Sequence, residues 1–304
     1  MNRAYISKLM ELAEKDKKII HLLSDSGTGF DEMFRKNFPD QIFNFGIGEE
    51  NMIAAAAGMA SVGKIPFAFT AGAFLAYRSM EFIRDDVCFQ NLNVKIVGMG
   101  SGLSWSSLGP THHTTEDISV LRAIPNLMIL SPSTPNLVKA CVEKAYKHQG
   151  PVYIKIEMND EKEYYPENCE INKDGMDVIK EGKDIAIFVT GSILEEVMDA
   201  AELLEKKNIS AKIINTVTLK PFNYEKSGLL MQGFNHIFSV EEHNIYGGLG
   251  SLLAEASAFG GLGKIIHPIG LNDCFAKGYG THKVVRKNNQ LDAEGIYKRI
   301  MEII

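Results

Sequence analysis

The stretch FNFGIGEENMIAAAAGMA (residues 43–60) joins an apolar, strand-like run to an alanine-rich run that is typical of a helix. Two adjacent carboxylates, Glu49 and Glu50, stand at the junction. The helix dipole and free backbone N–H groups stabilise acids in a first helical turn, which accounts for most such pairs. In an open α/β sheet, however, the same junction is the carboxyl end of a strand, where ligands bind. The stretch therefore predicts a strand–turn–helix unit and a candidate ligand site.

Strand-like and helix-like runs alternate along the rest of the chain. We expect strands at 19–24, 41–46, 65–70, 93–99, 127–132 and 151–156, and helices at 49–62, 72–90 and 134–148. After a charged segment without a sustained period (157–183), the alternation resumes with strands at 184–191, 210–216, 236–243 and 264–270 and helices at 193–207 and 249–258. This pattern predicts an α/β fold in which each domain is a mostly parallel sheet flanked by helices.

The length of 304 residues exceeds the usual size of a single domain, so two cores are expected. We place the first domain at 1–165, a linker at 166–183 and the second domain at 184–304. The restart of the strand pattern near residue 184 sets the second boundary.

Composition excludes several classes of function. A net charge of −6 argues against a nucleic-acid footprint, which requires a basic patch. No run approaches the roughly 20 apolar residues that span a bilayer, so no membrane segment is expected. The four cysteines are far apart and form no CxxC pair, which fits a reducing cytoplasm and indicates neither zinc nor a disulfide framework.

The segment GLSWSSLGPTHHTTEDISVLRAIPN (102–126) is long, polar and punctuated by glycine and proline. Loops between a strand and the next helix often carry function. Its adjacent histidines, His112 and His113, must point in different directions, so one at most faces a given site. No third His, Cys or Asp nearby completes a set of metal ligands. We therefore expect a histidine here to move a proton or to bind a hydroxyl. No GxGxxG or GxxxxGK[ST] motif indicates a self-contained nucleotide loop.

Several segments together resemble the pyrimidine-binding and C-terminal domains of transketolase. They are residues 43–60, NLNVKIVGMGSGL (91–103), GPTHHTTEDISVLRAIPN (109–126), SVEEHNIYGGLGS (239–251) and LDAEGI (291–296). The resemblance runs in order over essentially the whole chain. The family binds the diphosphate of thiamine diphosphate and its Mg²⁺ or Ca²⁺ through a GDG motif followed by Asn, and this chain has no GDG.

The chain thus resembles the C-terminal subunit of a split transketolase. The resemblance implies a separate N-terminal subunit that carries the GDG motif and holds the metal, self-association into an α2β2 assembly, and no metal ligand in this chain. It also implies thiamine diphosphate as the cofactor.

The resemblance assigns roles in the cofactor half of the site. Glu49 matches the family glutamate that hydrogen-bonds the pyrimidine N1′, whereas Glu50 is left with the capping role. Phe74 and Tyr77, in TAGAFLAYRSMEF (70–82), match positions where the family stacks aromatic rings on the aminopyrimidine. Core packing would explain Tyr77 nearly as well.

The sugar half of the site departs from the family. His112 matches the histidine of the family's GPTHQ motif, which contacts substrate hydroxyls and assists proton transfer. Leu108 stands where the family has an acid that binds a sugar hydroxyl, and Met158 stands where an arginine grips the substrate phosphate.

The expected function is transfer of a two-carbon ketol unit between sugars by a transketolase-like transferase, with a non-standard sugar substrate. One alternative is the β subunit of a 2-oxoacid dehydrogenase or of an acyloin-forming enzyme, which decarboxylation of pyruvate would favour. Another is a non-catalytic assembly subunit, which a purified complex lacking thiamine would favour.

Overall fold

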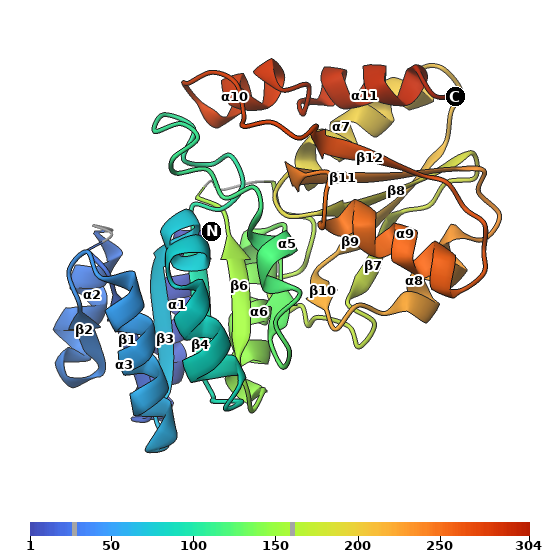
Figure 1. Cartoon of the computed structure of the whole chain (residues 1–304). Coiled ribbons are helices and arrows are strands. Elements are labelled where there is room, and N and C mark those ends of the chain that lie inside the picture. Colours follow the sequence, from blue (N-terminus) through green and yellow to red (C-terminus); the bar gives the residue numbers. More distant parts are fainter. Residues whose placement is uncertain (26–28, 159–161) are drawn as a thin grey trace.

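The computed structural model describes residues 1–25, 29–158 and 162–304. Two sheets lie in two lobes that pack side by side (Figure 1). The predicted α/β class is confirmed, since both sheets are mostly parallel and flanked by helices.

The first sheet has the strand order β10-β5-β6-β4-β3-β1-β2. Every neighbouring pair is parallel except β10 with β5. The central strands are buried along their whole length, because helices cover both faces and select continuous apolar runs. The strands are β1 Ile19–Leu23, β2 Ile42–Asn44, β3 Ile65–Ala71, β4 Lys95–Met99, β5 Met128–Leu130, β6 Val152–Ile156 and β10 Thr218–Lys220.

Helices α1 and α6 pack on one face of this sheet, and α3, α5 and the segment 74–88 pack on the other. The bounds are α1 Asn2–Lys15, α2 Phe30–Asn37, α3 Glu49–Ser61, α4 Met80–Phe82, α5 Asp117–Leu121 and α6 Pro135–Lys147. Helix α6 begins with a capping Thr134, whose side chain accepts the Leu137 N–H, and with proline in its first turn.

The second sheet has the order β12-β11-β8-β9-β7, and only β7 runs antiparallel to its neighbour. Helices α7 and α11 cover one face, whereas α8 and α9 cover the other and share a core with α5 of the first lobe. The bounds are β7 Met176–Lys180, β8 Ile185–Thr190, β9 Ala211–Thr216, β11 His236–Asn244, β12 Ile266–Leu271, α7 Leu194–Glu205, α8 Tyr224–Met231, α9 Leu249–Phe259, α10 His282–Asn288 and α11 Ala293–Met301.

Three local features differ from the sequence expectation. The segment 166–183, expected as a linker, contains β7, whose charged composition suits the half-exposed edge of a sheet. Strand β10 lies in the second half of the chain but pairs with the first sheet. The helix expected at 72–90 is instead π-helical at Phe74–Arg78 and Ile83–Cys88, with one α-helical turn between. Such π-turns are frequent at functional sites.

Candidate cofactor and sugar site

Glu49 begins α3 just beyond the carboxyl end of β2, and its side chain is buried at 2% exposure. Its Oε1 accepts a hydrogen bond of 3.0 Å from the Ser24 hydroxyl, which follows β1. The Ser24 and Thr70 hydroxyl oxygens are 2.8 Å apart, and Thr70 lies near the carboxyl end of β3. Polar groups from the ends of three adjacent strands thus form a chain from Thr70 through Ser24 to the buried Glu49, at the edge where α/β sheets bind ligands.

Arg78 reaches the other oxygen of Glu49 from outside. Its Nη1 donates to Glu49 Oε2 at 3.1 Å, and its Nε donates to Glu50 Oε1 at 2.8 Å. The arginine side chain is 47% exposed, whereas the Glu49 side chain is 2% exposed, so a solvent-exposed cation pairs with a buried carboxylate. No local sequence pattern indicated Arg78, because a π-turn brings it next to α3.

Phe74 and Tyr77 share that π-turn. The Phe74 ring lies 5.1 Å from the His112 ring in an edge-on arrangement, so the structure brings these two predicted residues together. The Tyr77 hydroxyl donates to Glu116 Oε2 at 2.8 Å and accepts the Glu116 N–H at 2.9 Å. Partial burial of the hydroxyl and the nearby Asp117 and Glu116 charges raise the pKa of Tyr77, although 38% of the residue is exposed.

His112 lies on a closed loop that we call the histidine loop (residues 102–114). Its neck is a pair of backbone hydrogen bonds between Gly102 and Thr114, of 3.1 and 2.9 Å. The loop also carries Trp105, whose ring centroid is 6.2 Å from that of His112. The imidazole thus contacts Phe74 and Trp105, and its Nδ1 is 3.0 Å from the Thr111 hydroxyl. Trp105 was not predicted, although it is the only tryptophan in the chain.

His113 diverges from His112, as expected of neighbours on a loop. It is 3% exposed, and burial lowers its pKa. Within the described residues, neither ring nitrogen has a hydrogen-bond partner. His113 is therefore a neutral core residue, and His112 is the histidine that faces the candidate site.

Leu108 and Met158 both neighbour the histidine loop. Leu108 lies on it and is 45% exposed. Met158 follows β6, is half-buried, and donates its N–H to the Ser104 hydroxyl at 3.3 Å. One of the two apolar residues thus belongs to the histidine loop, and the other is hydrogen-bonded to it.

Buried polar contacts fix the histidine loop to β6. The Lys155 ammonium donates to the Thr114 carbonyl at 3.0 Å and to Asp117 Oδ1 at 2.9 Å. The Tyr153 hydroxyl donates to Asp117 Oδ2 at 2.8 Å. A lysine in the otherwise apolar strand VYIKI was the only sequence signal for this network.

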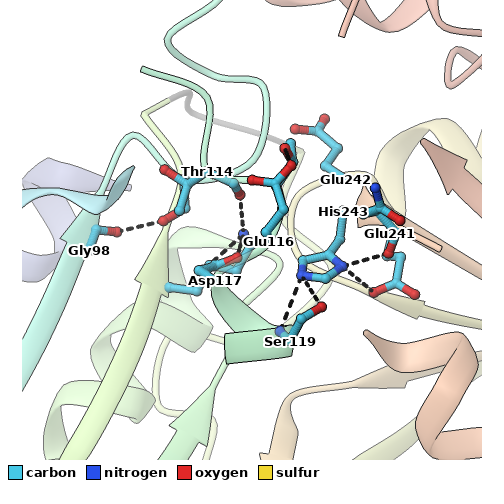
Figure 2. A network of polar contacts seen from close by, with 12 residues as sticks. Gly98, Thr114, Glu116, Asp117, Ser119, Glu241, Glu242 and His243 are labelled. Atoms are coloured by element: carbon cyan, nitrogen blue, oxygen red, sulfur yellow. Dashed lines mark hydrogen bonds and ion pairs between the residues drawn. The ribbon is translucent and has the colours of Figure 1, made fainter. Parts of the chain in front are cut away.

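The C-terminal lobe also contacts α5, the helix that follows the histidine loop. Figure 2 shows His243 of β11 facing Ser119 of α5, with Glu241 behind the imidazole. The His243 Nε2 lies 3.4 Å from both the Ser119 N–H nitrogen and its hydroxyl. Glu241 accepts N–H groups of Leu249 and Gly250 at 2.8 and 2.9 Å and so caps α9. The motif SVEEHNIYGGLGS thus joins the lobes as well as starting a helix.

A second buried cluster lies between the lobes. The carboxylate of Glu242 accepts the Leu103 N–H at 2.7 Å and contacts His282 and Arg286. Burial acts to raise the pKa of Glu242, but the charges of Arg286 and His282 outweigh it and lower the pKa. Glu157, next to this cluster, has its pKa raised to about 8 by burial and by the Glu242 charge.

The described part of the chain offers neither a metal-ligand cluster nor a membrane-crossing helix. Within residues 1–25, 29–158 and 162–304, no three His, Cys, Asp or Glu side chains gather in a way that could hold a metal ion. In the same ranges, the helices lack the length and apolarity needed to cross a bilayer.

Two family models match the chain. The transketolase pyrimidine-binding domain matches residues 1–159, and the transketolase C-terminal domain matches residues 174–296. A solved structure described as a split gene transketolase, inactive beta4 tetramer, has a TM-score of 0.89 at 31% identity and covers 99% of this chain and 96% of its own.

Curated relatives agree with these matches. A putative transketolase C-terminal section of Methanocaldococcus jannaschii is 36% identical, over 99% of this chain and 95% of its own length. One of the subunits of an apulose-4-phosphate transketolase of Actinobacillus succinogenes is 34% identical, over 96% of this chain and 94% of its own length. A 6-deoxy-6-sulfo-D-fructose transketolase subunit of a Clostridium species is 31% identical, over 98% of this chain and 92% of its own length. The chain therefore belongs to the transketolase family, of which it carries the pyrimidine-binding and C-terminal domains.

Proposed function

We propose that this chain is the C-terminal subunit of a thiamine diphosphate-dependent transferase that moves a two-carbon ketol unit between sugars. The observation that carries the proposal is the buried carboxylate of Glu49 at the carboxyl edge of the sheet, in contact with Arg78 of the π-turn that also carries Phe74 and Tyr77. A buried acid with one oxygen on Ser24 and the other on the half-exposed Arg78 suits a ligand that replaces the guanidinium and shares a proton.

The residues present fit the aminopyrimidine of thiamine diphosphate. When bound, this cofactor supplies a carbon nucleophile and an electron sink for chemistry next to a carbonyl. Glu49 would hold a proton at the pyrimidine N1′ after displacing Arg78, and Ser24 would keep the carboxyl oriented. Phe74 and Tyr77 would pack on the ring, since their π-turn follows β3 beside α3.

The sugar half of the site supports a non-standard substrate. His112 offers a ring nitrogen for a substrate hydroxyl and is oriented by Phe74 and Trp105. Leu108 and Met158 offer neither a hydrogen-bond acceptor for a hydroxyl nor a charge for a phosphate. The names of two relatives, which refer to apulose 4-phosphate and 6-deoxy-6-sulfofructose, also favour a sugar outside the common pentose and hexose phosphates.

Activity requires an N-terminal subunit in this proposal. The chain has no GDG motif to bind a metal-bound diphosphate, whose charge must be met by a metal and its ligands. The partner would hold Mg²⁺ or Ca²⁺, and the pair would form an α2β2 assembly. A cytoplasmic location remains a prediction that rests on the separated cysteines.

Calorimetry tests the proposal directly. Thiamine diphosphate with Mg²⁺ should bind the chain weakly or not at all, and should bind tightly when an N-terminal transketolase subunit is added. The reconstituted pair should then transfer a two-carbon unit from a ketose donor to an aldose. Tight binding to the single chain would contradict the split site, and decarboxylation of pyruvate without ketol transfer would support the 2-oxoacid dehydrogenase alternative instead.

A further inference from the structure

We propose that Tyr279, on the segment between β12 and α10 of the C-terminal lobe, is a positioning residue for His112. It deepens the proposed function, because it gives the C-terminal lobe a part in shaping the sugar half of the site. Figure 1 shows the loop after β4 projecting from the first lobe toward α10, and Gly109 of this loop lies against Tyr279.

The contact is between the Tyr279 ring and Gly109 of the histidine loop. A Cβ added to Gly109 would lie 2.2 Å from Cε1 of Tyr279, 2.9 Å from Cζ and 3.0 Å from the hydroxyl oxygen. Apart from atoms of the neighbouring residues, these are its three nearest heavy atoms, so the edge of the tyrosine ring occupies the space that a side chain at Gly109 would need. Gly109 has φ +78°, a conformation that favours glycine, and its missing side chain lets the tyrosine approach.

Gly109 in turn forms a hydrogen bond with His112. The Gly109 carbonyl accepts the His112 N–H at 2.9 Å and the His113 N–H at 3.2 Å. A shift of Gly109 therefore moves the backbone of the turn that carries the imidazole. The 5.1 Å ring contact between Phe74 and His112 depends on the position of that turn.

Different contacts support the neck of the histidine loop, at Gly102 and Thr114, and its tip, at Gly109. Buried groups fix the neck, where Glu242 binds the Leu103 N–H at 2.7 Å and Lys155 binds the Thr114 carbonyl at 3.0 Å. At the tip, the exposed ring of Tyr279 supports Gly109 from the other lobe. Tyr279 is 65% exposed, so its truncation should loosen the tip without unfolding the protein.

Trp105 reports on this loop, since it is the only tryptophan of the chain and neighbours His112. In the purified full chain, we would measure acrylamide quenching of Trp105 and the loss of its emission on acidification, when a protonated imidazole quenches the indole. The same acid titration of the His112→Gln variant shows how much of this loss of Trp105 emission is due to His112.

Tyr279→Ala should raise the quenching constant of Trp105 at least about twofold, as expected of a locally loosened segment. It should also diminish the part of the acid quenching due to His112, with a thermal midpoint within about 2 °C of the parent. Tyr279→Phe keeps the ring and should behave as the parent. Phe275→Ala removes another exposed aromatic from the same segment and is the matched control.

The proposal is overturned if Tyr279→Ala leaves both fluorescence signals unchanged, or if Phe275→Ala changes them equally. With the N-terminal subunit added, Tyr279→Ala should lower kcat by about tenfold to a hundredfold while KM for the donor stays within twofold, roughly the effect of a misplaced catalytic group. If the parent pair shows no ketol transfer, the proposed function fails, whereas the fluorescence still decides whether Tyr279 positions His112.

Discussion

The Lys155 ammonium lies 2.9 Å from Oδ1 and 3.1 Å from Oδ2 of Asp117, and neither side chain is more than 3% exposed. Lys155 lies on β6, and Asp117 is the first residue of α5, which follows the histidine loop. The pair also binds the Tyr153 hydroxyl and the Thr114 carbonyl, so the ion pair is supported by neutral hydrogen bonds. It fixes the end of the loop that carries His112.

Lys155→Met should destabilise the protein by about 3–5 kcal/mol, because it leaves the Asp117 carboxylate buried without a counter-charge. Urea denaturation followed by circular dichroism measures the change. Lys139→Met is the control, since it breaks an exposed pair with Glu167 and should cost less than about 1 kcal/mol. Equal losses in the two variants would contradict the importance of the buried pair.

Glu49→Gln should lower turnover of the reconstituted enzyme by about two to four orders of magnitude, on the scale of a lost acid–base group. The amide keeps the shape of the side chain and can still accept from Ser24, so the thermal midpoint should barely change. Glu50→Gln is the matched control, because Glu50 is the adjacent acid and also binds Arg78. If turnover falls further in Glu50→Gln than in Glu49→Gln, then Glu50 and not Glu49 makes the cofactor contact.

The contribution of Glu157 to the stability of the folded chain should decrease as the pH rises from about 5 to about 8. Burial and the Glu242 charge raise the pKa of Glu157 from its ordinary value of 4.5 to about 8, so in this window the folded state binds a proton that the unfolded state has lost. The stability present below pH 4.5 is therefore lost as the pH rises through the folded pKa.

Glu157→Gln should flatten this pH dependence, because the amide does not titrate, and should stabilise the protein at pH 8 relative to the parent. Chemical denaturation at several pH values measures the slope. Glu167→Gln, at a side chain that is 78% exposed, should leave the slope unchanged. A difference in stability between the parent and Glu157→Gln that stays constant from pH 5 to 8 would show that Glu157 is ionised in the folded state.

Leu108→Asp should improve kcat/KM for xylulose 5-phosphate with ribose 5-phosphate, because an acceptor would then face a hydroxyl that the leucine leaves unpaired at a cost of about 1–3 kcal/mol. The parent pair should use these sugars poorly. Leu108→Asn is the control that adds polarity without the charge and should recover less. A parent kcat/KM at the ordinary transketolase level would contradict a non-standard substrate.

The alternation of apolar runs predicted most of the parallel strands and the α/β class, because a strand buried on both faces needs a continuous apolar run. The helix from Glu49 was predicted for a similar reason, since its alanine-rich run follows a turn and two acids. The resemblance to transketolase then assigned Glu49 and His112 from local motifs. Edge strands β7 and β10 were missed, because β7 is half-exposed and β10 is only three residues long, so neither carries a clear apolar pattern.

Tertiary structure alone decided how the site is assembled. Arg78 meets Glu49 because the segment after β3 forms a π-turn, and Tyr77 meets Glu116 because the chain returns to the same edge of the sheet. Tyr279 meets Gly109 because the lobes pack together. Local sequence pattern records which face of a strand or helix is buried, whereas these contacts join segments far apart in sequence and depend on how complete elements pack.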